Sequence, residues 1–282
     1  MWIWLTIGSA LLLGTYDVAK KVALGRNDVY YVLLAATGLT TLFLSPFLSL
    51  GTPSQHLQLV LKAVLVASSW VSGMLALKLL PITTVSTLKA SRPMFVVLFS
   101  ILIFGERLSL LQWLGVLLVL GAIWLMSVAS SKEGIRFGSD KGILAVGVSI
   151  ITGVASALWD KHILEGMQPF FVQGWTNLYV TVILALIIVF RKVRLKAAAE
   201  RFRWDWTLPL IALLITGADA LYFFALKEEG AMLSVISTVR RCSVIVTFVL
   251  GALIFKEKHL RGKAVSLALM LAGIILTMFA SV

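Results

Sequence analysis

Four cationic side chains stand inside stretches of sequence that are otherwise apolar: Lys89, Arg92, Arg240 and Arg241. A lysine or arginine at the centre of a lipid-embedded helix costs about 2.5–3.5 kcal/mol on insertion scales, so these residues cannot face lipid. Lys89 and Arg92 are three residues apart and share one face of a helix. Because guanidinium forks match the paired oxygens of carboxylate and phosphate groups, the residues predict a buried site for an anion.

Carboxylates and aromatic residues accompany the cations in other apolar stretches. Asp17, Asp160 and Asp219 could neutralise part of the positive charge or carry a coupled proton. Asp219 and Tyr222 share a helix face, and Trp70 and Ser72 lie at the equivalent depth earlier in the chain. The predicted substrate-binding residues are Lys89, Arg92, Arg240, Arg241, Asp219, Tyr222, Trp70 and Ser72, with Asp17, Asp160 and Asp219 as candidates for coupling.

The remaining residues suited to metal or redox chemistry form no pattern. The three histidines, His56, His162 and His259, have no second ligand at a spacing typical of metal sites, and Cys242 is the single cysteine. We therefore expect no metal and no cofactor.

The composition requires a lipid environment for the elements that carry these residues. Of the 282 residues, 60% are hydrophobic and 13% are charged, and the mean hydropathy is +0.99. Soluble domains have about 45–50% apolar and 25% charged residues. The net charge of +12 would favour nucleic-acid binding in a soluble protein, but these charges lie mostly between apolar segments. The expected partners are the lipid bilayer and a small-molecule substrate, with no nucleic acid.

Apolar stretches of about 20 residues, long enough to cross a bilayer as helix, occur ten times. A polar linker at 131–140 divides the chain into a first unit, 1–130, and a second unit, 141–282. The expected spans are 2–24, 29–49, 58–79, 83–104, 109–129, 141–163, 169–190, 206–227, 231–255 and 260–281.

The distribution of Lys and Arg between these spans predicts the orientation. Seventeen basic residues, Lys20 and Lys263 among them, lie on one side, in connections or near the ends of spans, whereas the other side holds only Lys62, Arg107, Lys161 and Lys227. Since cytoplasmic loops collect Lys and Arg, we expect a multi-pass protein of the cell inner membrane with both termini outside.

The two units contain a repeated sequence. Residues 85–107, VSTLKASRPMFVVLFSILIFGER, align without gaps to residues 236–258, ISTVRRCSVIVTFVLGALIFKEK, which places Lys89 opposite Arg240. Ala76-Leu77-Lys78 recurs as Ala225-Leu226-Lys227, and Tyr16-Asp17 is similar to Trp159-Asp160. A unit of five spans is odd in number, so the second copy must cross the membrane in the opposite sense, as in many secondary transporters.

This pattern resembles the ten-span EamA-type members of the drug/metabolite transporter superfamily over essentially the whole chain. The resemblance is carried by Pro93, Gly105, Glu106, the segment 112–115 and Gly121. Val244 and Lys256 depart from the pattern at positions where proline and glycine are expected. The resemblance implies an all-α membrane fold of ten helices in two inverted five-helix repeats.

The basic cluster is similar to that of the phosphate-translocator branch of the same superfamily. In that branch a lysine on the fourth helix and a Lys-Arg pair on the ninth hold the phosphate. Lys89 matches the first position, and Arg240 and Arg241 match the pair, with arginine in place of the lysine. The resemblance thus implies a phosphorylated or carboxylate-bearing substrate.

The sequence accordingly favours a secondary active transporter of an organic anion that works by alternating access, by anion exchange or with a coupled proton, and as a monomer. One alternative is an exporter of amino acids or of neutral or cationic metabolites that uses Asp17 and Asp219. A remote alternative is an intramembrane enzyme or lipid-handling protein, for which the sequence offers no nucleophile–base pair.

Overall fold

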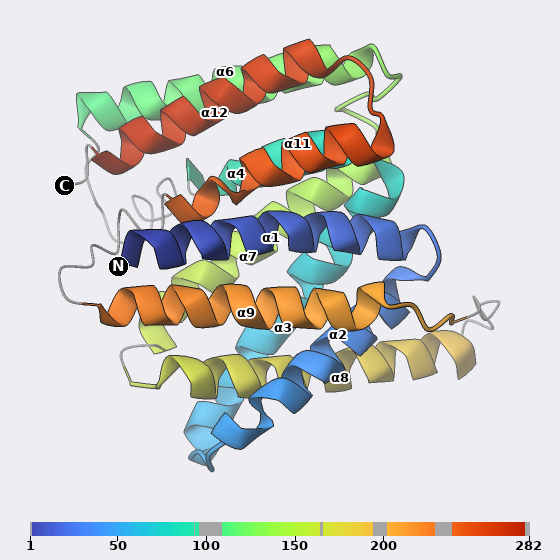
Figure 1. Cartoon of the computed structure of the whole chain (residues 1–282), viewed down its shortest axis with the longest axis vertical. Coiled ribbons are helices and arrows are strands. Elements are labelled where there is room, and N and C mark those ends of the chain that lie inside the picture. Colours follow the sequence, from blue (N-terminus) through green and yellow to red (C-terminus); the bar gives the residue numbers. More distant parts are fainter. Residues whose placement is uncertain are drawn as a thin grey trace.

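The computed structural model describes residues 2–92, 94–95, 109–163, 166–193, 202–228 and 239–279, and these residues form an all-helical bundle (Figure 1). This part of the chain contains ten α-helices and one 3-10 helix. The elements are α1 (Trp2–Leu24), α2 (Val29–Leu44), η1 (Ser45–Phe47), α3 (Pro53–Leu79), α4 (Ile82–Ala90), α6 (Leu110–Ser131), α7 (Lys141–Ile163), α8 (Pro169–Val193), α9 (Thr207–Lys227), α11 (Ser243–Phe255) and α12 (Leu260–Phe279).

Five of these helices, α1, α3, α6, α7 and α8, are long and apolar enough to cross a membrane. Shorter apolar stretches lie in α2 and α9. Large apolar side chains are exposed along the outside, as on α6, where Trp113, Leu117 and Trp124 are 48%, 60% and 69% exposed. Exposed apolar helices of this length are consistent with a multi-pass membrane protein.

Local signals set three helix ends, two of which differ by five residues from the expected positions. α3 begins at Pro53 rather than 58, because Thr52 and Gln55 form a capping box and proline is favoured in the first turn. Ser109 and Gln112 form the equivalent capping box at the start of α6. α2 ends at Leu44 rather than 49, where the η1 turn containing a proline follows.

The structure corrects the expectation of continuous helices at 83–104 and 231–255. α4 ends at Ala90, and the Ser91 hydroxyl donates to the Leu88 carbonyl at 2.6 Å. α11 begins at Ser243, after a turn at Cys242. The gapless alignment of the repeat pairs Ser91 with Cys242, so the fourth and ninth helices are interrupted at equivalent positions. Pro93, Gly105 and Glu106 lie outside the described residues.

Packing between the two halves follows a symmetric pattern (Figure 1). The first helix of each half packs against the third helix of the other, as α1 with α9 and α7 with α3. The second helices, α2 and α8, pack together, as do α4 with α11 and α6 with α12. A twofold relation between the halves produces this pairing. α1 begins and α12 ends at the same end of the bundle.

A buried ion cluster joins the start of α4 to the second half. The Glu257 carboxylate accepts hydrogen bonds from the backbone N–H of Ile82 at 2.7 Å and from the N–H and hydroxyl of Thr83. Lys263, whose side chain is fully buried, lies 2.8 Å from Glu133 and 3.9 Å from Glu257. The carboxylate caps the amino end of a nine-residue helix that has no side-chain cap of its own.

Lys263→Ala should therefore destabilise the protein strongly. Removing one partner of a buried ion pair leaves an uncompensated charge, which typically costs about 3–5 kcal/mol. Thermal unfolding of the purified protein in detergent measures the effect, with Lys258→Ala as the matched control, because Lys258 is exposed in the same turn region. Equal unfolding temperatures for the two variants would contradict this account of the cluster.

Candidate functional site

A cavity of about 270 Å³, which we call the basic cavity, lies where the interrupted helices α4 and α11 meet α1 and α3. Its charged lining residues, as far as the structure describes the chain, are the cations Lys20, Lys89, Arg92 and Arg241 and the single carboxylate of Asp17. The carboxyl end of α4 and the amino end of α11 both border the cavity, so their opposite partial charges offset each other. The positive charge of the cavity therefore comes from side chains.

Small residues on neighbouring helices make room for two of these cations. A Cβ placed on Gly73 of α3 would collide with the Lys89 amine, and a Cβ on Gly153 of α7 would lie 2.8 Å from Cζ of Arg92. Lys89 and Arg92 thus lie directly against the backbone of α3 and α7. A side chain of any size at these glycines would displace the cations.

Arg92 is held by hydroxyl and carbonyl groups rather than by a carboxylate. One guanidinium nitrogen donates to the Ser69 hydroxyl at 3.0 Å, and to the carbonyl and hydroxyl of Ser149 at 2.8 and 2.9 Å. Ser69 and Ser149 also bond each other's carbonyls, which ties α3 to α7. These neutral partners fix the direction of the guanidinium and leave its charge intact.

The single carboxylate of the basic cavity is already engaged. Asp17 lies 2.5 Å from Lys20, whose amine also sits 4.0 Å from the centre of the Tyr16 ring. Among the described residues, neither Lys89 nor Arg241 has a hydrogen-bond or ion-pair partner. Three cations of the cavity, Lys89, Arg92 and Arg241, thus have no carboxylate partner within the part of the chain that the structure describes.

A second cavity, of about 430 Å³, contains equal numbers of positive and negative groups, and we call it the ion-paired cavity. Lys62 pairs with Asp160, and Arg240 pairs with Asp219. Gln173 donates to the other Asp219 oxygen at 2.6 Å. The Arg240 guanidinium lies 4.4 Å from the centre of the Tyr222 ring, and its Nε donates to Ser9 at 3.1 Å. Each charged group in this cavity therefore has an opposite charge beside it.

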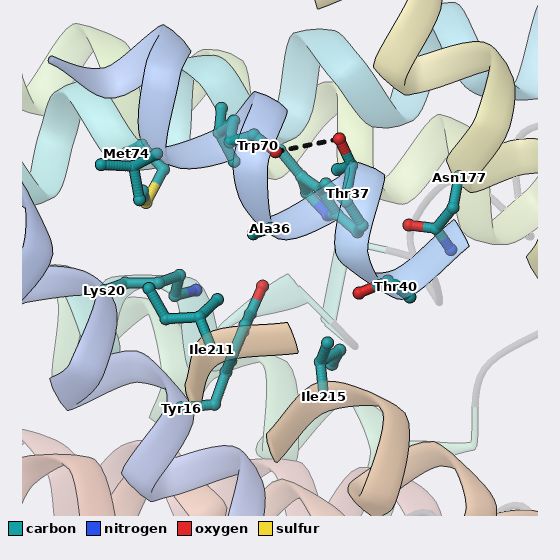
Figure 2. Close-up of a pocket in the computed structure, with 12 residues that line it drawn as sticks. Tyr16, Lys20, Ala36, Thr37, Thr40, Trp70, Met74, Asn177, Ile211 and Ile215 are labelled. Atoms are coloured by element: carbon teal, nitrogen blue, oxygen red, sulfur yellow. Dashed lines mark hydrogen bonds between the residues drawn. The ribbon is translucent and has the colours of Figure 1, made fainter. Parts of the chain in front are cut away.

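Trp70 and Ile215 line both cavities and also the narrow gap between them (Figure 2). Figure 2 shows Tyr16 and Lys20 of α1 facing Trp70 and Met74 of α3 across this gap. Its volume is about 10 Å³, near the minimum that holds one water molecule. A gap of this size between the described residues is too small to hold a metabolite.

The structure divides the predicted site residues between these two cavities. Lys89, Arg92, Arg241 and Asp17 line the basic cavity, whereas Arg240, Asp219, Tyr222 and Asp160 line the ion-paired cavity, with Trp70 in both. Ser72 is not among the lining residues, and its hydroxyl donates to the Ser68 carbonyl of its own helix at 2.6 Å. The four cations thus do not form one cluster, because the adjacent residues Arg240 and Arg241 line different cavities.

Two charged lining residues were missed by sequence reasoning. Lys20 and Lys62 were counted as loop residues, but they lie within α1 and α3 and form ion pairs with Asp17 and Asp160. Lys263, also counted in a loop, is buried in α12. The signal available for Lys20 was its i, i+3 spacing from Asp17.

Comparison with solved structures supports the fold. One crystal structure, described only as that of a protein, matches with a TM-score of 0.65 over 99% of this chain and 96% of the other, at 16% sequence identity. At this identity the likeness concerns the fold alone. No curated protein sequence matches the chain.

Two interrupted helices at the meeting point of two similar halves, bordering buried charged cavities, are typical of secondary transporters. The chain belongs to the EamA-like transporter family, whose model matches residues 1–128 and again residues 140–279. The double match shows two copies of one unit and confirms the resemblance found in the sequence. Family membership indicates a membrane transporter of small molecules rather than an enzyme.

The contact between Gly153 and Arg92 predicts opposite effects for two substitutions in α7. Gly147→Ala should stabilise the protein by up to about 1 kcal/mol, because alanine favours helix and its Cβ would meet nothing within 4 Å. Gly153→Ala should instead lower stability, because the guanidinium must move and lose charged hydrogen bonds worth about 1.5–3 kcal/mol each. Thermal unfolding of both variants measures the difference, and an equal gain in both would disprove the contact.

Proposed function

We propose that the protein is a secondary active transporter of a small organic anion, with the basic cavity as its substrate site. The observation that carries the proposal is the excess of three unneutralised cations, Lys89, Arg92 and Arg241, in a cavity of about 270 Å³. Like charges that lie close together without carboxylate partners repel one another, and an anion bound between them would neutralise that charge. The affinity for an anion therefore arises from charge that the empty protein leaves exposed.

The geometry of the cations favours a phosphate or carboxylate group. Two of the three are guanidinium groups, which bind paired oxygens through parallel hydrogen bonds. Arg92 is fixed in direction by Ser69 and Ser149, while Arg241 and Lys89 keep donors available. A phosphorylated substrate agrees with the similarity of Lys89 and Arg241 to phosphate-holding positions of the phosphate-translocator branch, whereas Arg240, the third matching residue, is paired with Asp219.

Alternating access of two inverted repeats is the mechanism that we propose. The narrow gap at Trp70 and Ile215 separates the two cavities, so a rocking motion of the halves could open each side in turn. The proposed setting is the cell inner membrane, with termini outside and a monomer as the working unit. The Lys and Arg bias that supports this orientation persists when Lys20, Lys62 and Lys263 are left out.

The contacts of the carboxylates weigh against the alternative of an exporter of cationic or neutral metabolites. That alternative requires Asp17 or Asp219 to be available to a cation. Asp17 is paired with Lys20, and Asp219 is bound by both Arg240 and Gln173. A cationic substrate would have to displace these partners and then enter a cavity that is itself positive.

Lys89→Ala and Arg241→Ala should each reduce uptake of the anionic substrate by at least tenfold, which corresponds to about 1.4 kcal/mol of lost binding. Uptake into proteoliposomes of phosphate esters, dicarboxylates, amino acids and quaternary amines measures the effect. Lys258→Ala removes an exposed positive charge outside the cavities and serves as control. Unchanged uptake of every anion, together with loss of quaternary-amine uptake in Asp219→Asn, would favour the cation exporter instead.

The excess of positive charge in the basic cavity also predicts exchange, because closing the empty cavity would bury that charge without a counter-ion. Proteoliposomes loaded with unlabelled substrate should take up labelled substrate at least tenfold faster than empty ones. A pH gradient imposed on empty vesicles provides the contrast. Rapid uptake driven by that gradient alone would contradict exchange and would indicate proton coupling.

A further inference from the structure

Trp70 on α3 and Asp219 on α9 occupy equivalent positions in the two halves. The match of residues 76–78 with residues 225–227 sets the register between these helices. Counting back along both helices pairs Gly73 with Tyr222, and Trp70 with Asp219. The two halves therefore differ in charge at this position.

The contacts of the two equivalent cations support this register independently. Lys89 and Arg240 are paired by the alignment of the fourth and ninth helices. The Lys89 amine lies against Gly73, and the Arg240 guanidinium lies 4.4 Å from the centre of the Tyr222 ring. Each cation thus contacts the third helix of its own half at the equivalent position, Gly73 in the first half and Tyr222 in the second.

The residue one turn earlier decides whether the cation is neutralised. In the second half Asp219, three residues before Tyr222, forms an ion pair with Arg240. In the first half the corresponding residue is Trp70, three residues before Gly73 and on the same helix face. Trp70 lines the basic cavity together with Lys89 but offers no carboxylate.

We infer that the residue at position 70 determines the charge of the substrate. Tryptophan at this position leaves the Lys89 charge available to an anion, whereas aspartate at the equivalent position of the other half satisfies Arg240. This inference rests on the proposed anion site. Trp70 is then a specificity-determining residue, because its uncharged side chain does not neutralise Lys89.

The variants that test the inference exchange the two residue types. Trp70→Asp adds the missing carboxylate beside Lys89, and Trp70→Asn removes the same indole without adding charge, so their difference isolates the charge. Asp219→Asn removes the neutralising charge from Arg240. Binding of inorganic phosphate and of succinate to the purified full chain is measured by calorimetry and by thermal shift.

The first outcome concerns anion binding. The Kd for the anion should be at least tenfold larger in Trp70→Asp than in Trp70→Asn. Asp219→Asn, which leaves Arg240 of the ion-paired cavity without its carboxylate, should bind the anion there more tightly than the unsubstituted protein does. Equal affinities of Trp70→Asp and Trp70→Asn would overturn the inference while leaving the anion site in place. Failure of the unsubstituted protein to bind either anion would instead overturn the proposed function on which the inference rests.

The second outcome needs no substrate. Unfolding temperatures of the unsubstituted protein, Trp70→Asp, Lys89→Ala and the double variant form a double-mutant cycle. If an aspartate at position 70 pairs with Lys89, Trp70→Asp should destabilise the Lys89→Ala protein by several degrees more than it destabilises the unsubstituted protein. An additive cycle would overturn the inference, whatever the binding experiment shows.

Discussion

Positive charge that no carboxylate of the described residues neutralises is the constraint on which the rest of the structure depends. A charge placed in a low-dielectric interior is unfavourable unless it is paired, so most proteins pair it or avoid it. Here Arg92 is held by the hydroxyls of Ser69 and Ser149, which satisfy hydrogen bonds without cancelling charge. The glycines of α3 and α7 then let the cations lie directly against the backbone. Serines and glycines at these positions keep the site both ordered and charged.

The interruption of α4 and α11 has a related role. A continuous helix would carry its side chains past the centre of the bundle on a smooth spiral, with all backbone groups bonded within the helix. Interruption at Ser91 and Cys242 brings two helix ends to the basic cavity and turns the chain where the cations stand. Because the two helix ends have opposite partial charges, the interruption changes the lining of the cavity but leaves its net charge unchanged.

The sequence predicted most of the helices and the repeat, and most of the residues that it singled out line one of the two cavities, but it did not predict the interruption of α4 and α11 or how those residues are divided. Apolar length is a strong signal for a helix, and the Lys89–Arg240 correspondence follows from a gapless alignment. Arg240 and Arg241 are neighbours in sequence, yet successive residues of a helix point about 100° apart, so tertiary contacts decide which cavity each one lines. Lys20 and Lys62 lie near the ends of apolar stretches, where a lysine side chain commonly extends to the membrane surface. In the structure they instead line the cavities, because they form ion pairs with Asp17 and Asp160. No glycine or proline lies directly before Ser243, so the sequence gives no signal of the helix break there.

The cap that Glu257 provides for α4 has a consequence for the order in which the protein can be made. The carboxylate and the helix start that it caps are separated by 175 residues in sequence. At a synthesis rate of about 5–20 residues per second, roughly ten to thirty seconds pass between the appearance of Ile82 and that of Glu257. During that interval the amino end of α4 lacks this partner, although most of the first half has already been made. The start of α4, in the first half of the chain, thus receives its cap from a residue near the end of the second half. This part of the first half cannot reach its final structure until synthesis of the chain is nearly complete.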